Sequence, residues 1–558
     1  MENIKNIFEI WKNNVTEKKY KEMLQNLNQE EMYESFYKNL EFGTAGLRGI
    51  MGMGTNRMNI YTVRQTTQGF ADYLNDKYKS LFLSVAISYD SRNNSYEFAK
   101  ESARVLAANN IKVYITDELK PTPVLSFAVR KLNCQGGIMI TASHNPPEYN
   151  GYKCYGEDGA QILDDDAKKI YESIEKIDIF KDVKLIEFES GIKSKSIEFI
   201  HESLYDEYIK EVMNQGINKD SCRNSDLCVV YTPLNGAGNK LVKKVIDLIG
   251  IKNFYVVPEQ ENPDGNFTTC KYPNPESREC FSLAKDFARE KKADLIISTD
   301  PDCDRIGVCV FDGKEYIFLS GNEIGVLLVS YILKYREFMG TLPKNSVIVK
   351  TIVSTNFIDK IAKKYNCEVL NVLTGFKYIG KEIRKLEKSS ESQRYILGFE
   401  ESHGYLIGTY ARDKDAVVAS MMICEMAAFY KKEGLSLLDV LEDIYKEFGK
   451  FYSKNMNLEF SGNKDDMKKI KAIMENLRKN PLKSIGGLEV NNILDFMDCY
   501  NKDFPKANVI RFELDNDNVL IVRPSGTEPK IKIYIMSGSL ETVNNISKDI
   551  NNILLQKP

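Results

Sequence analysis

Short apolar segments alternate with longer amphipathic segments along most of the chain. In the first third, this pattern predicts a helix at residues 95–109 and strands at 83–89, 111–115 and 137–140. Each apolar segment is bounded by turn residues, which is typical of βα units around a largely parallel sheet. The chain is therefore predicted to have an α/β fold.

The same pattern starts again twice, and the end of the chain departs from it. The repeated blocks predict strands at 227–231, 254–257, 294–298, 346–350, 367–372 and 395–399. Near the end, a lysine-rich helical segment precedes three closely spaced strands at 509–514, 518–522 and 530–536, with a final helix. We expect three similar mixed-sheet α/β domains and a smaller C-terminal α+β domain. The predicted bounds are 1–200, 201–319, 320–450 and 451–558.

Charge and composition narrow the class of protein. The 76 basic and 79 acidic residues among 558 nearly cancel, so no global field attracts nucleic acid or an anionic membrane. The apolar stretches at 325–333 and 416–424 are too short to span a bilayer, and the first residues lack the apolar core of a secretion signal. We expect a cytoplasmic protein with neither a nucleic-acid nor a membrane partner. The sequence shows no coiled-coil heptads, and it leaves the oligomeric state open.

Cysteine and histidine usage points to a reducing compartment and against zinc. The 11 cysteines include no C-x-x-C pair, which predicts reduced and mostly buried thiols. Only three histidines, His144, His201 and His403, are available as zinc ligands.

A loop with a candidate nucleophile follows the strand predicted at 137–140. It reads Thr-Ala-Ser-His-Asn-Pro-Pro, and Lys153 follows shortly after. In an open α/β sheet, ligands collect at the carboxyl ends of the strands. The two prolines stiffen the turn, so Ser143 is expected on a rigid loop beside His144 and Lys153. An ordinary capped turn is the alternative.

Three aspartates at alternate positions follow the strand predicted at 294–298. Asp300, Asp302 and Asp304 can bring carboxylate oxygens to one divalent cation. An EF-hand is excluded, because Arg305 replaces its glycine and Phe311 its closing glutamate. A solvated acidic turn is the alternative, but the adjacent apolar strand would partly desolvate the carboxylates. Mg²⁺ that contacts a phosphate is the natural use of this site.

Three further loops carry polar groups at strand ends. Glu400 and Ser402 lie on a glycine-flanked turn that can contact sugar hydroxyls, although a helix cap at Ser402 is the alternative. Near the end of the chain, a predicted phosphate clamp consists of Arg523, Ser525, Gly526 and Thr527, with a simple hairpin turn as the alternative. Arg48 lies in a glycine-rich loop that lacks the lysine of a nucleotide P-loop.

Taken in this order, the motifs TASHNP, DPDCDR, GFEES and RPSGTEPK resemble the α-D-phosphohexomutase superfamily. The segments GFEESHGYLIG and ARDKDAV are most similar to its bacterial phosphoglucomutase branch. The resemblance extends from Gly43 to Tyr534. It implies three α/β domains and a C-terminal domain around one cleft, which agrees with the blocks predicted above.

The resemblance also implies roles for individual residues. Ser143 would be the phosphoserine, and with Asp300, Asp302 and Asp304 it would hold Mg²⁺. Lys153, Arg48 and His144 match positions of acid/base and charge-stabilising groups, and the proton donor among them stays open. Glu400 and Ser402 would contact the sugar. Further ligand contacts would come from Arg305, Thr374, Gly375, Phe376, Lys377, Arg412 and Lys414, and from the clamp residues Arg523, Ser525, Gly526 and Thr527. His403 departs from the pattern, because the commoner histidine position is that of Gly404, and it is not predicted to be catalytic.

The implied reaction is an exchange of phosphate on one hexose. Phospho-Ser143 would transfer its group to glucose 1-phosphate, giving glucose 1,6-bisphosphate, which turns around and returns its other phosphate as glucose 6-phosphate leaves. Transfer to sugar rather than water requires closure of the cleft, and the C-terminal domain is the expected moving part. Free glucose 1,6-bisphosphate is expected to act as an activator. The preference among glucose, mannose and pentose phosphates is not predicted.

Two other functions remain as alternatives. A metal-dependent phosphatase of the haloacid dehalogenase type requires a small hydroxyl residue or valine two positions after its second aspartate. In this sequence Ile306 follows Asp304 at that distance, which argues against such a phosphatase. A non-catalytic phosphosugar-binding protein is the second alternative, and it would never carry phosphate at Ser143. The retained polar groups in all four motifs argue against it.

Overall fold

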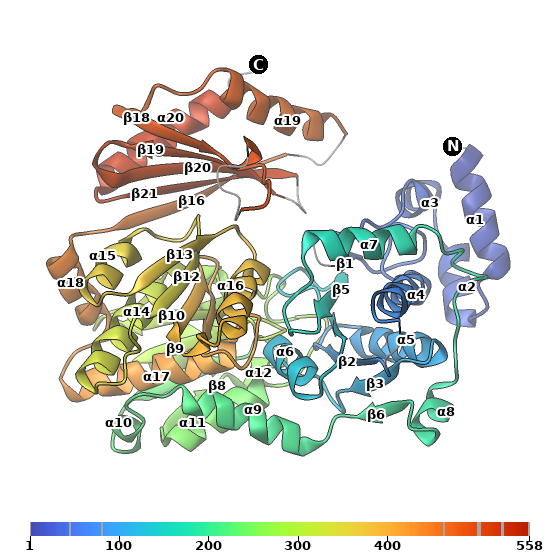
Figure 1. The fold of residues 1–558 in the computed structure, drawn as a ribbon, viewed down its shortest axis with the longest axis horizontal. Helices are drawn as coiled ribbons and strands as arrows, with labels where there is room; N and C mark the ends of the chain where they lie inside the picture. Colours follow the sequence, from blue (N-terminus) through green and yellow to red (C-terminus); the bar gives the residue numbers. More distant parts are fainter. Residues whose placement is uncertain are drawn as a thin grey trace.

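The computed structural model describes residues 2–43, 46–79, 82–460, 464–498, 504–525 and 529–555. Its strands form four successive sheets (Figure 1). No helix in these ranges is long and apolar enough to cross a membrane. The predicted cytoplasmic location stays a prediction, as do the predicted domain bounds, although each sheet takes all its strands from one predicted range.

The first sheet has six strands in the order β1-β5-β4-β2-β3-β6. Strands β4, β2, β3 and β6 are parallel, whereas β5 runs antiparallel to β4, and the edge strand β1 runs antiparallel to β5. Its strands are β1 (Gly46–Ile50), β2 (Ser84–Tyr89), β3 (Lys112–Ile115), β4 (Gly136–Ile140), β5 (Tyr149–Gly156) and β6 (Ile197–Phe199). The associated helices are α4 (Ile60–Lys77), α5 (Ser95–Ala108), α6 (Thr122–Lys131), α7 (Asp164–Ile174) and α8 (Phe188–Lys193). The predicted strands and helix of the first third are confirmed.

Three short helices precede this domain and pack on it. They are α1 (Glu2–Asn14), α2 (Lys18–Gln25) and α3 (Gln29–Phe36). Trp11 of α1 is buried, and its ring lies 5.6 Å from the ring of Phe36 and 5.7 Å from that of Tyr61 on α4. Edge-to-face contacts of this kind attach the N-terminal helices to the first domain.

The second and third sheets are also mixed: the strands on one side are parallel, and antiparallel strands complete the other side. Their orders are β11-β10-β9-β7-β8 and β13-β12-β14-β15. The strands are β7 (Cys228–Thr232), β8 (Asn253–Val256), β9 (Leu295–Thr299), β10 (Ile306–Phe311), β11 (Tyr316–Leu319), β12 (Val347–Thr351), β13 (Glu368–Val372), β14 (Tyr395–Glu400) and β15 (Gly404–Ile407). The helices are α9 (Glu202–Asn214), α10 (Asp220–Arg223), α11 (Asn239–Ile249), α12 (Pro258–Glu261), α13 (Ser282–Lys291), α14 (Gly321–Phe338), α15 (Phe357–Lys364), α16 (Phe376–Lys388), α17 (Ala416–Lys432) and α18 (Leu437–Phe448). The six strands predicted for these blocks are confirmed.

The two apolar stretches of the sequence form buried helices between these sheets. Residues 325–333 lie in α14 and residues 416–424 in α17, and nearly every side chain of α17 is buried. A helix that is apolar all round belongs in a protein core when it is too short for a membrane. Side chains from the second and third sheets accordingly share one hydrophobic cluster with these helices.

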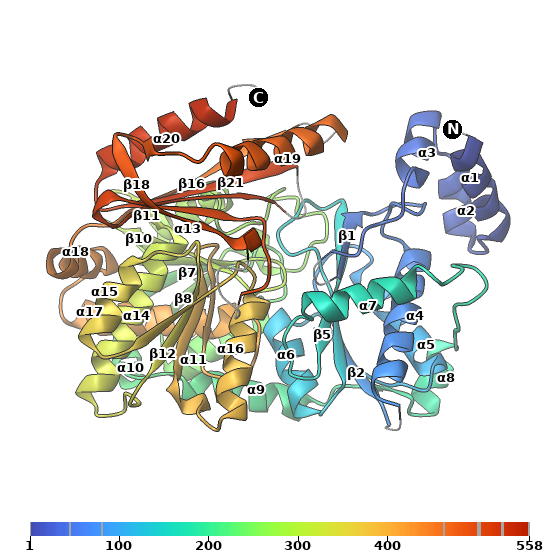
Figure 2. The ribbon, with the colours of Figure 1, turned by 45° about the horizontal axis from the view of Figure 1, so that its top comes forward.

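The C-terminal domain has a single antiparallel sheet in the order β16-β21-β20-β19-β18-β17. Its strands are β16 (Tyr452–Glu459), β17 (Ser484–Ile485), β18 (Leu488–Asp495), β19 (Ile510–Leu514), β20 (Asn518–Pro524) and β21 (Lys530–Ser537). The helices α19 (Lys464–Lys479) and α20 (Leu540–Leu555) cover one face, as Figure 2 shows. This α+β domain agrees with the prediction.

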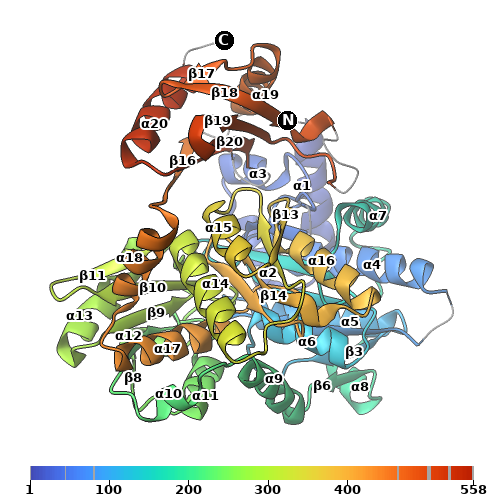
Figure 3. The ribbon, with the colours of Figure 1, turned by 60° about the vertical axis from the view of Figure 1, so that its left-hand side comes forward.

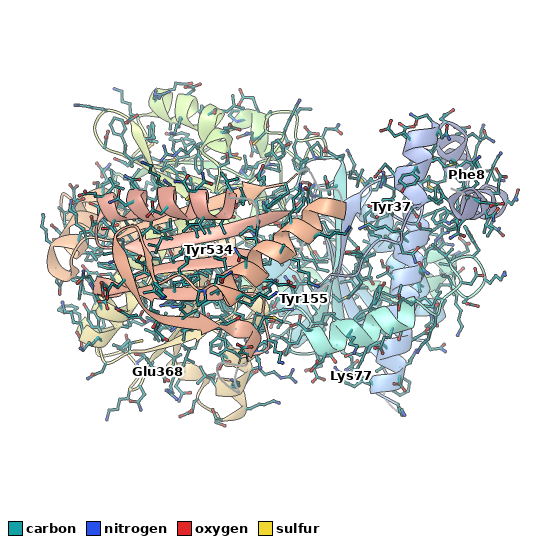
Figure 4. All side chains as sticks on the ribbon, turned by 90° about the horizontal axis from the view of Figure 1, so that it is seen from above. Phe8, Tyr37, Lys77, Tyr155, Glu368 and Tyr534 are labelled. Atoms are coloured by element: carbon teal, nitrogen blue, oxygen red, sulfur yellow. The ribbon has the colours of Figure 1, made fainter. Side chains whose placement is uncertain are left out.

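The other face of the C-terminal sheet packs on the third domain. Tyr534, labelled in Figure 4, and Ile521 share a hydrophobic cluster with Ile352, Val353 and Leu373, which follow β12 and β13. Figure 3 shows the C-terminal domain seated above the third domain and connected to it through β16. This contact brings the C-terminal sheet against the residues that follow β12 and β13.

Candidate active site

Ser143 lies directly beside the three aspartates, although they come from different domains. Its Oγ donates a hydrogen bond of 2.8 Å to Oδ2 of Asp300, and it is 3% exposed. Ser143 follows β4 of the first sheet, and Asp300 follows β9 of the second. The carboxyl ends of the two parallel sheet centres therefore meet at this point, as expected for ligand sites in α/β folds.

The backbone of the Ser143 loop is held in an unusual conformation. Ser143 has a φ of 51°, in the left-handed region, and its amide donates to Thr141 Oγ1 at 2.7 Å. Such a conformation costs about 1–3 kcal/mol and persists only where neighbours enforce it. The neighbour here is Arg92, whose buried guanidinium donates to the carbonyl oxygens of Ser143 at 2.6 Å and Pro146 at 2.8 Å. The sequence reasoning missed Arg92, and its place just after the strand predicted at 83–89 was the only signal.

The three carboxylates form a compact and fully buried cluster. Asp300, Asp302 and Asp304 each offer an oxygen within 4.8 Å of the others. Oδ1 of Asp302 and Oδ1 of Asp304 are buried and have no hydrogen-bond partner in the described parts of the chain. Buried carboxylate oxygens without partners are costly unless a cation takes them. The donor set consists of hard oxygens, so the residues present fit Mg²⁺.

Two lysines partly balance this charge from opposite sides. Lys153 on β5 donates to Asp302 Oδ2 at 2.8 Å, and the ammonium of Lys414 lies 3.0 Å from Asp304 Oδ2. Burial, together with the adjacent carboxylates of Asp302 and Asp304, raises the pKa of Asp300 well above its ordinary value. The two ammonium groups leave one of the three carboxylate charges unbalanced, and a divalent cation can balance it. The structure brings Lys153 and Lys414 to the aspartate cluster, and their implied roles toward a substrate stay predictions.

Helix α6 also supports the cluster, which the sequence did not predict. The amide of Thr122 donates to the carbonyl oxygen of Asp302 at 2.9 Å, and its Oγ1 donates to Asp302 Oδ2 at 3.0 Å. Thr122 is the first residue of α6, so the partial positive charge of a helix N-terminus faces the carboxylate. This contact joins the first domain to the aspartate loop (residues 300–304) of the second domain.

His144 and Arg48 flank the serine. His144 Nδ1 lies 3.2 Å from Ser143 Oγ, and Arg48 on β1 donates to Asn145 Oδ1 at 3.0 Å. Burial lowers the pKa of His144 well below its ordinary value, and the positive charges of Arg305 and Arg48 add to this effect. His144 is therefore neutral at physiological pH, and its ring nitrogen can exchange a proton.

The predicted sugar loop lies at the end of β14. Glu400 is 5% exposed, and its Oε1 accepts from the amide of Gly375 at 2.9 Å. Gly375 has a φ of 120° and stands just before α16, a position that a side chain would strain. Ser402 lies in the turn between β14 and β15, so the alternative of a helix cap is wrong. Because β14 and β15 form a hairpin, Ser402 cannot begin a helix.

His403 has a structural contact. It is 4% exposed, and its Nδ1 lies 3.1 Å from the carbonyl oxygen of Ile306, whose amide in turn donates to the carbonyl oxygen of His403 at 3.0 Å. These contacts join the turn after β14 to β10 of the second sheet. Burial lowers the pKa of His403.

Three predicted substrate residues are engaged by other side chains. Lys377 donates to Asp164 of α7 at 2.7 Å, and Arg305 forms an ion pair with Glu276. Arg412 is 0% exposed, and its Nη2 donates to Glu387 at 2.8 Å. Arg412 therefore connects its loop to α16, whereas Lys377 joins the third domain to the first. Their predicted contact with substrate stays a prediction.

The predicted phosphate clamp is described in part. Arg523 is the second-last residue of β20, and its Nη1 is buried without a hydrogen-bond partner among the residues described. The amide of Ser525 donates to the carbonyl oxygen of Lys530 at 2.8 Å. Thr374 Oγ1, before α16, is likewise buried and without a described partner. Gly526 and Thr527 lie outside the described residues. A buried guanidinium nitrogen in need of an acceptor fits an anion.

Comparison with known families decides the identity. Models of the α/β/α domains I, II and III of phosphoglucomutase/phosphomannomutase match residues 39–180, 206–313 and 320–448, and the model of the C-terminal domain matches residues 457–553. The chain belongs to the phosphoglucomutase/phosphomannomutase family. The resemblance seen in the four motifs is confirmed, and so is the four-domain architecture.

Relatives within the family match over nearly the whole chain. The chain is 39% identical over 533 residues to a phosphoglucomutase of Staphylococcus haemolyticus, with 93% of this chain and 94% of the relative covered. It is 37% identical over 560 residues to a phosphoglucomutase of Staphylococcus aureus, with 98% of each covered.

Solved structures share the fold. The open form of the Paramecium phosphoglucomutase parafusin is 19% identical and covers 93% of this chain and 94% of its own, with a TM-score of 0.68. A family protein from Burkholderia thailandensis is 18% identical and covers 92% of this chain and 96% of its own, with a TM-score of 0.69.

Proposed function

We propose that the chain is a phosphoglucomutase that interconverts glucose 1-phosphate and glucose 6-phosphate through phospho-Ser143 and glucose 1,6-bisphosphate. The single observation that carries this proposal is the 2.8 Å contact between Ser143 Oγ and Asp300, inside a buried cluster of three carboxylates. A hydroxyl held there can carry a phosphoryl group next to a divalent cation. The staphylococcal relatives named phosphoglucomutases support the same reaction.

Ser143, Asp300, Asp302 and Asp304 would hold Mg²⁺. When bound, Mg²⁺ supplies positive charge that stabilises the phosphoryl group during transfer. A solved structure of the Aspergillus fumigatus N-acetylphosphoglucosamine mutase, with a TM-score of 0.51, was obtained in complex with GlcNAc-6P and magnesium. That observation belongs to a distant relative, and for this chain it adds to the argument from the unpartnered aspartate oxygens.

The protein's own side chains would prepare the transfer. Arg92 fixes the carbonyl oxygen of Ser143, so that Ser143 Oγ points toward the three carboxylates. Neutral His144, 3.2 Å from Ser143 Oγ, can accept a proton. Lys153 is charged, because Asp302 and Asp304 outweigh the effect of burial and raise its pKa. Lys153 and Arg48 would therefore stabilise the negative charge of the phosphate.

The sugar would be held away from the chemistry. Glu400 and Ser402 would contact its hydroxyls, and Arg523 with Ser525, Gly526 and Thr527 would grip the phosphate that does not react. One clamp that accepts either phosphate lets the bisphosphate turn around without a second site. The C-terminal domain would close over the sugar and exclude water, since water would otherwise take the phosphoryl group.

A substrate panel tests the function. The purified chain is incubated with glucose 1-phosphate, mannose 1-phosphate or ribose 1-phosphate, with Mg²⁺ and with or without glucose 1,6-bisphosphate. We expect isomerisation of glucose 1-phosphate, stimulation by the bisphosphate, and a mass increase of one phosphate on Ser143. Release of free phosphate without isomer would instead identify a phosphatase, and absence of both products would identify a binding protein.

A further inference from the structure

A long loop of the second domain contacts both halves of the candidate active site. It comprises residues 262–277, between α12 and the short helix η1 (Arg278–Phe281), and is called the strap below. Its first part is fixed by Asn235, whose Nδ2 donates to the carbonyl oxygen of Asn262 at 2.7 Å and whose Oδ1 accepts from Thr269 Oγ1 at 3.0 Å. The strap therefore has a defined course over the domain.

One end of the strap reaches the phosphoserine loop. The guanidinium of Arg92 lies over the ring of Phe267, 4.9 Å from its centroid, and Asn93 Nδ2 donates to Asn266 Oδ1 at 2.7 Å. Phe267 is 1% exposed. Arg92 also donates a hydrogen bond to the carbonyl oxygen of Ser143. A displacement of Phe267 would therefore move Arg92 and, through it, the Ser143 loop.

The other end of the strap contacts the residues that directly follow the aspartate loop. Glu276 forms an ion pair with Arg305, the residue after Asp304, and the Arg305 side chain is 18% exposed. The carbonyl oxygen of Pro275 lies so close to Gly307 that a Cβ there would come within 2.4 Å of it. The backbone of the strap is thus packed tightly against the start of β10.

Two cysteines join the strap to η1 between these contacts. The Sγ atoms of Cys270 and Cys280 are 3.2 Å apart. Cys280 is 2% exposed, and its thiol also lies 2.9 Å from the carbonyl oxygen of Tyr272, whereas Cys270 is partly exposed. Cys270 is the one thiol that is not fully buried among the ten cysteines in the described residues.

The electrostatics favour Cys270 as the reactive thiol. The hydrogen bond from Cys280 lowers the pKa of Cys270, while the same contact and burial raise the pKa of Cys280. A partly exposed thiol with a lowered pKa beside a second thiol is the usual arrangement of an attacking and a resolving cysteine.

We propose that Cys270 and Cys280 form a reversible disulfide under peroxide, and that this bond alters phosphosugar binding by moving the strap. The thiolate of Cys270 attacks one oxygen of hydrogen peroxide, giving a sulfenic acid and hydroxide. The sulfur of Cys280 then displaces the hydroxyl of the sulfenic acid. In sum, two thiols and one peroxide give one disulfide and two waters, so peroxide takes both electrons. A thiol reductant reverses the bond.

The displacement caused by the disulfide would reach Arg305 through Glu276. An S–S bond is about 2.05 Å long, so the two sulfurs must approach by roughly 1 Å. Glu276 lies between the two cysteines in sequence, and it can follow only by shifting its ion pair with Arg305. This second half of the proposal rests on the proposed mutase function, because Arg305 matters only if the site binds a phosphosugar.

The first test is chemical and independent of activity. The full-length chain is treated with hydrogen peroxide, alkylated, and analysed by intact mass and by a non-reducing peptide map. We expect loss of two hydrogens per chain, a linked peptide pair containing Cys270 and Cys280, and full reversal by dithiothreitol. C270S should form no internal disulfide, and C280S should stop at an oxidised Cys270. C228S is the matched control in the same domain and should behave as the natural chain. A native chain that forms no such link, or links other cysteines instead, overturns the proposal.

The second test measures the coupling. Oxidised and reduced enzyme are compared for KM toward glucose 1-phosphate, and we expect KM to rise about fivefold on oxidation, the low end of ordinary coupling between sites. C270S should show the reduced KM under both conditions. A disulfide that forms without any change in KM refutes the link to Arg305. A chain without mutase activity still yields the mass result, so failure of the proposed function is distinguished from failure of the redox site.

Discussion

The guanidinium of Arg92 donates a hydrogen bond of 2.6 Å to the carbonyl oxygen of Ser143. The same group binds the carbonyl oxygens of Pro146 and Tyr149 at 2.8 and 3.0 Å. One planar cation thus ties the first residues of the loop to its end. We regard Arg92 as a positioning residue, because it acts on the phosphoryl carrier through the backbone.

Replacing Arg92 by Lys should therefore disorder the loop without removing the charge. A lysine cannot offer the planar fork, and several buried carbonyl oxygens lose their donor, at about 1–3 kcal/mol each. We expect kcat to fall about 10²-fold with a smaller change in KM, together with a lower melting temperature. Steady-state kinetics and calorimetry measure both. R289K, at the exposed Arg289 of α13, is the control and should leave both unchanged. A variant with natural kcat would show that the grip is dispensable.

Removing the hydroxyl of Ser143 should abolish turnover. S143A loses the hydrogen bond to Asp300 but keeps the three carboxylates, so the chain should fold and bind Mg²⁺. We expect no isomerisation above background and no phosphate on the protein by intact mass. S173A, on the surface of α7, should retain both. Residual mutase activity in S143A would place the phosphoryl carrier elsewhere.

The three aspartates should make the activity depend on a divalent cation. EDTA is expected to reduce turnover to background, and Mg²⁺ should restore it, because Oδ1 of Asp302 and Oδ1 of Asp304 are buried without a hydrogen-bond partner among the described residues. D304N should weaken the apparent Mg²⁺ affinity at least about tenfold, since one charged ligand is lost. Titration of activity with Mg²⁺ measures this. D312N, on the turn after β10, is the control, and an unchanged Mg²⁺ requirement in D304N would contradict the site.

Glu401 should make stability depend on pH. Burial and the neighbouring carboxylates of Glu400 and Glu276 raise its pKa from 4.5 to about 7. Between these values the folded state holds a proton that the unfolded state has released, so stability falls as pH rises from about 4.5 to about 7 and is level above. E401Q cannot ionise, so its free energy of unfolding should lack this slope. Between pH 5 and pH 8, the variant should therefore gain on the order of 1–3 kcal/mol of stability relative to the natural chain. Urea unfolding at the two pH values measures the difference. The exposed E433Q is the control, and parallel curves for E401Q and the natural chain would refute the assignment.

Much of the fold followed from periodicity. The strands at 83–89, 294–298 and 395–399 were predicted because short apolar runs ended at turn residues, and β2, β9 and β14 occupy these places. The repeated blocks predicted mixed sheets, and a change in spacing after residue 450 predicted a different last domain. Local sequence suffices here, because strand formation and burial depend on the order of apolar and polar residues along a short segment.

The candidate site was predicted as motifs rather than as contacts. Asp300, Asp302 and Asp304 are close in sequence, so their convergence could be expected from spacing alone. The partners of the cluster could not, because Lys153, Thr122 and Lys414 reach it from other domains. The helix cap at Ser402 failed for a similar reason: the pairing of β14 with β15 overrides a local capping signal.

The sequence by itself determined which residues stand at strand ends, and thus which chemistry is available: a serine hydroxyl, three carboxylates, a sugar loop and an arginine clamp. Only the tertiary structure decided that Ser143, 157 positions before Asp300, donates to it and that Arg92 holds the carbonyl oxygen of Ser143. The physical reason is that side-chain contacts between distant segments depend on how whole sheets pack, which no short stretch of sequence encodes.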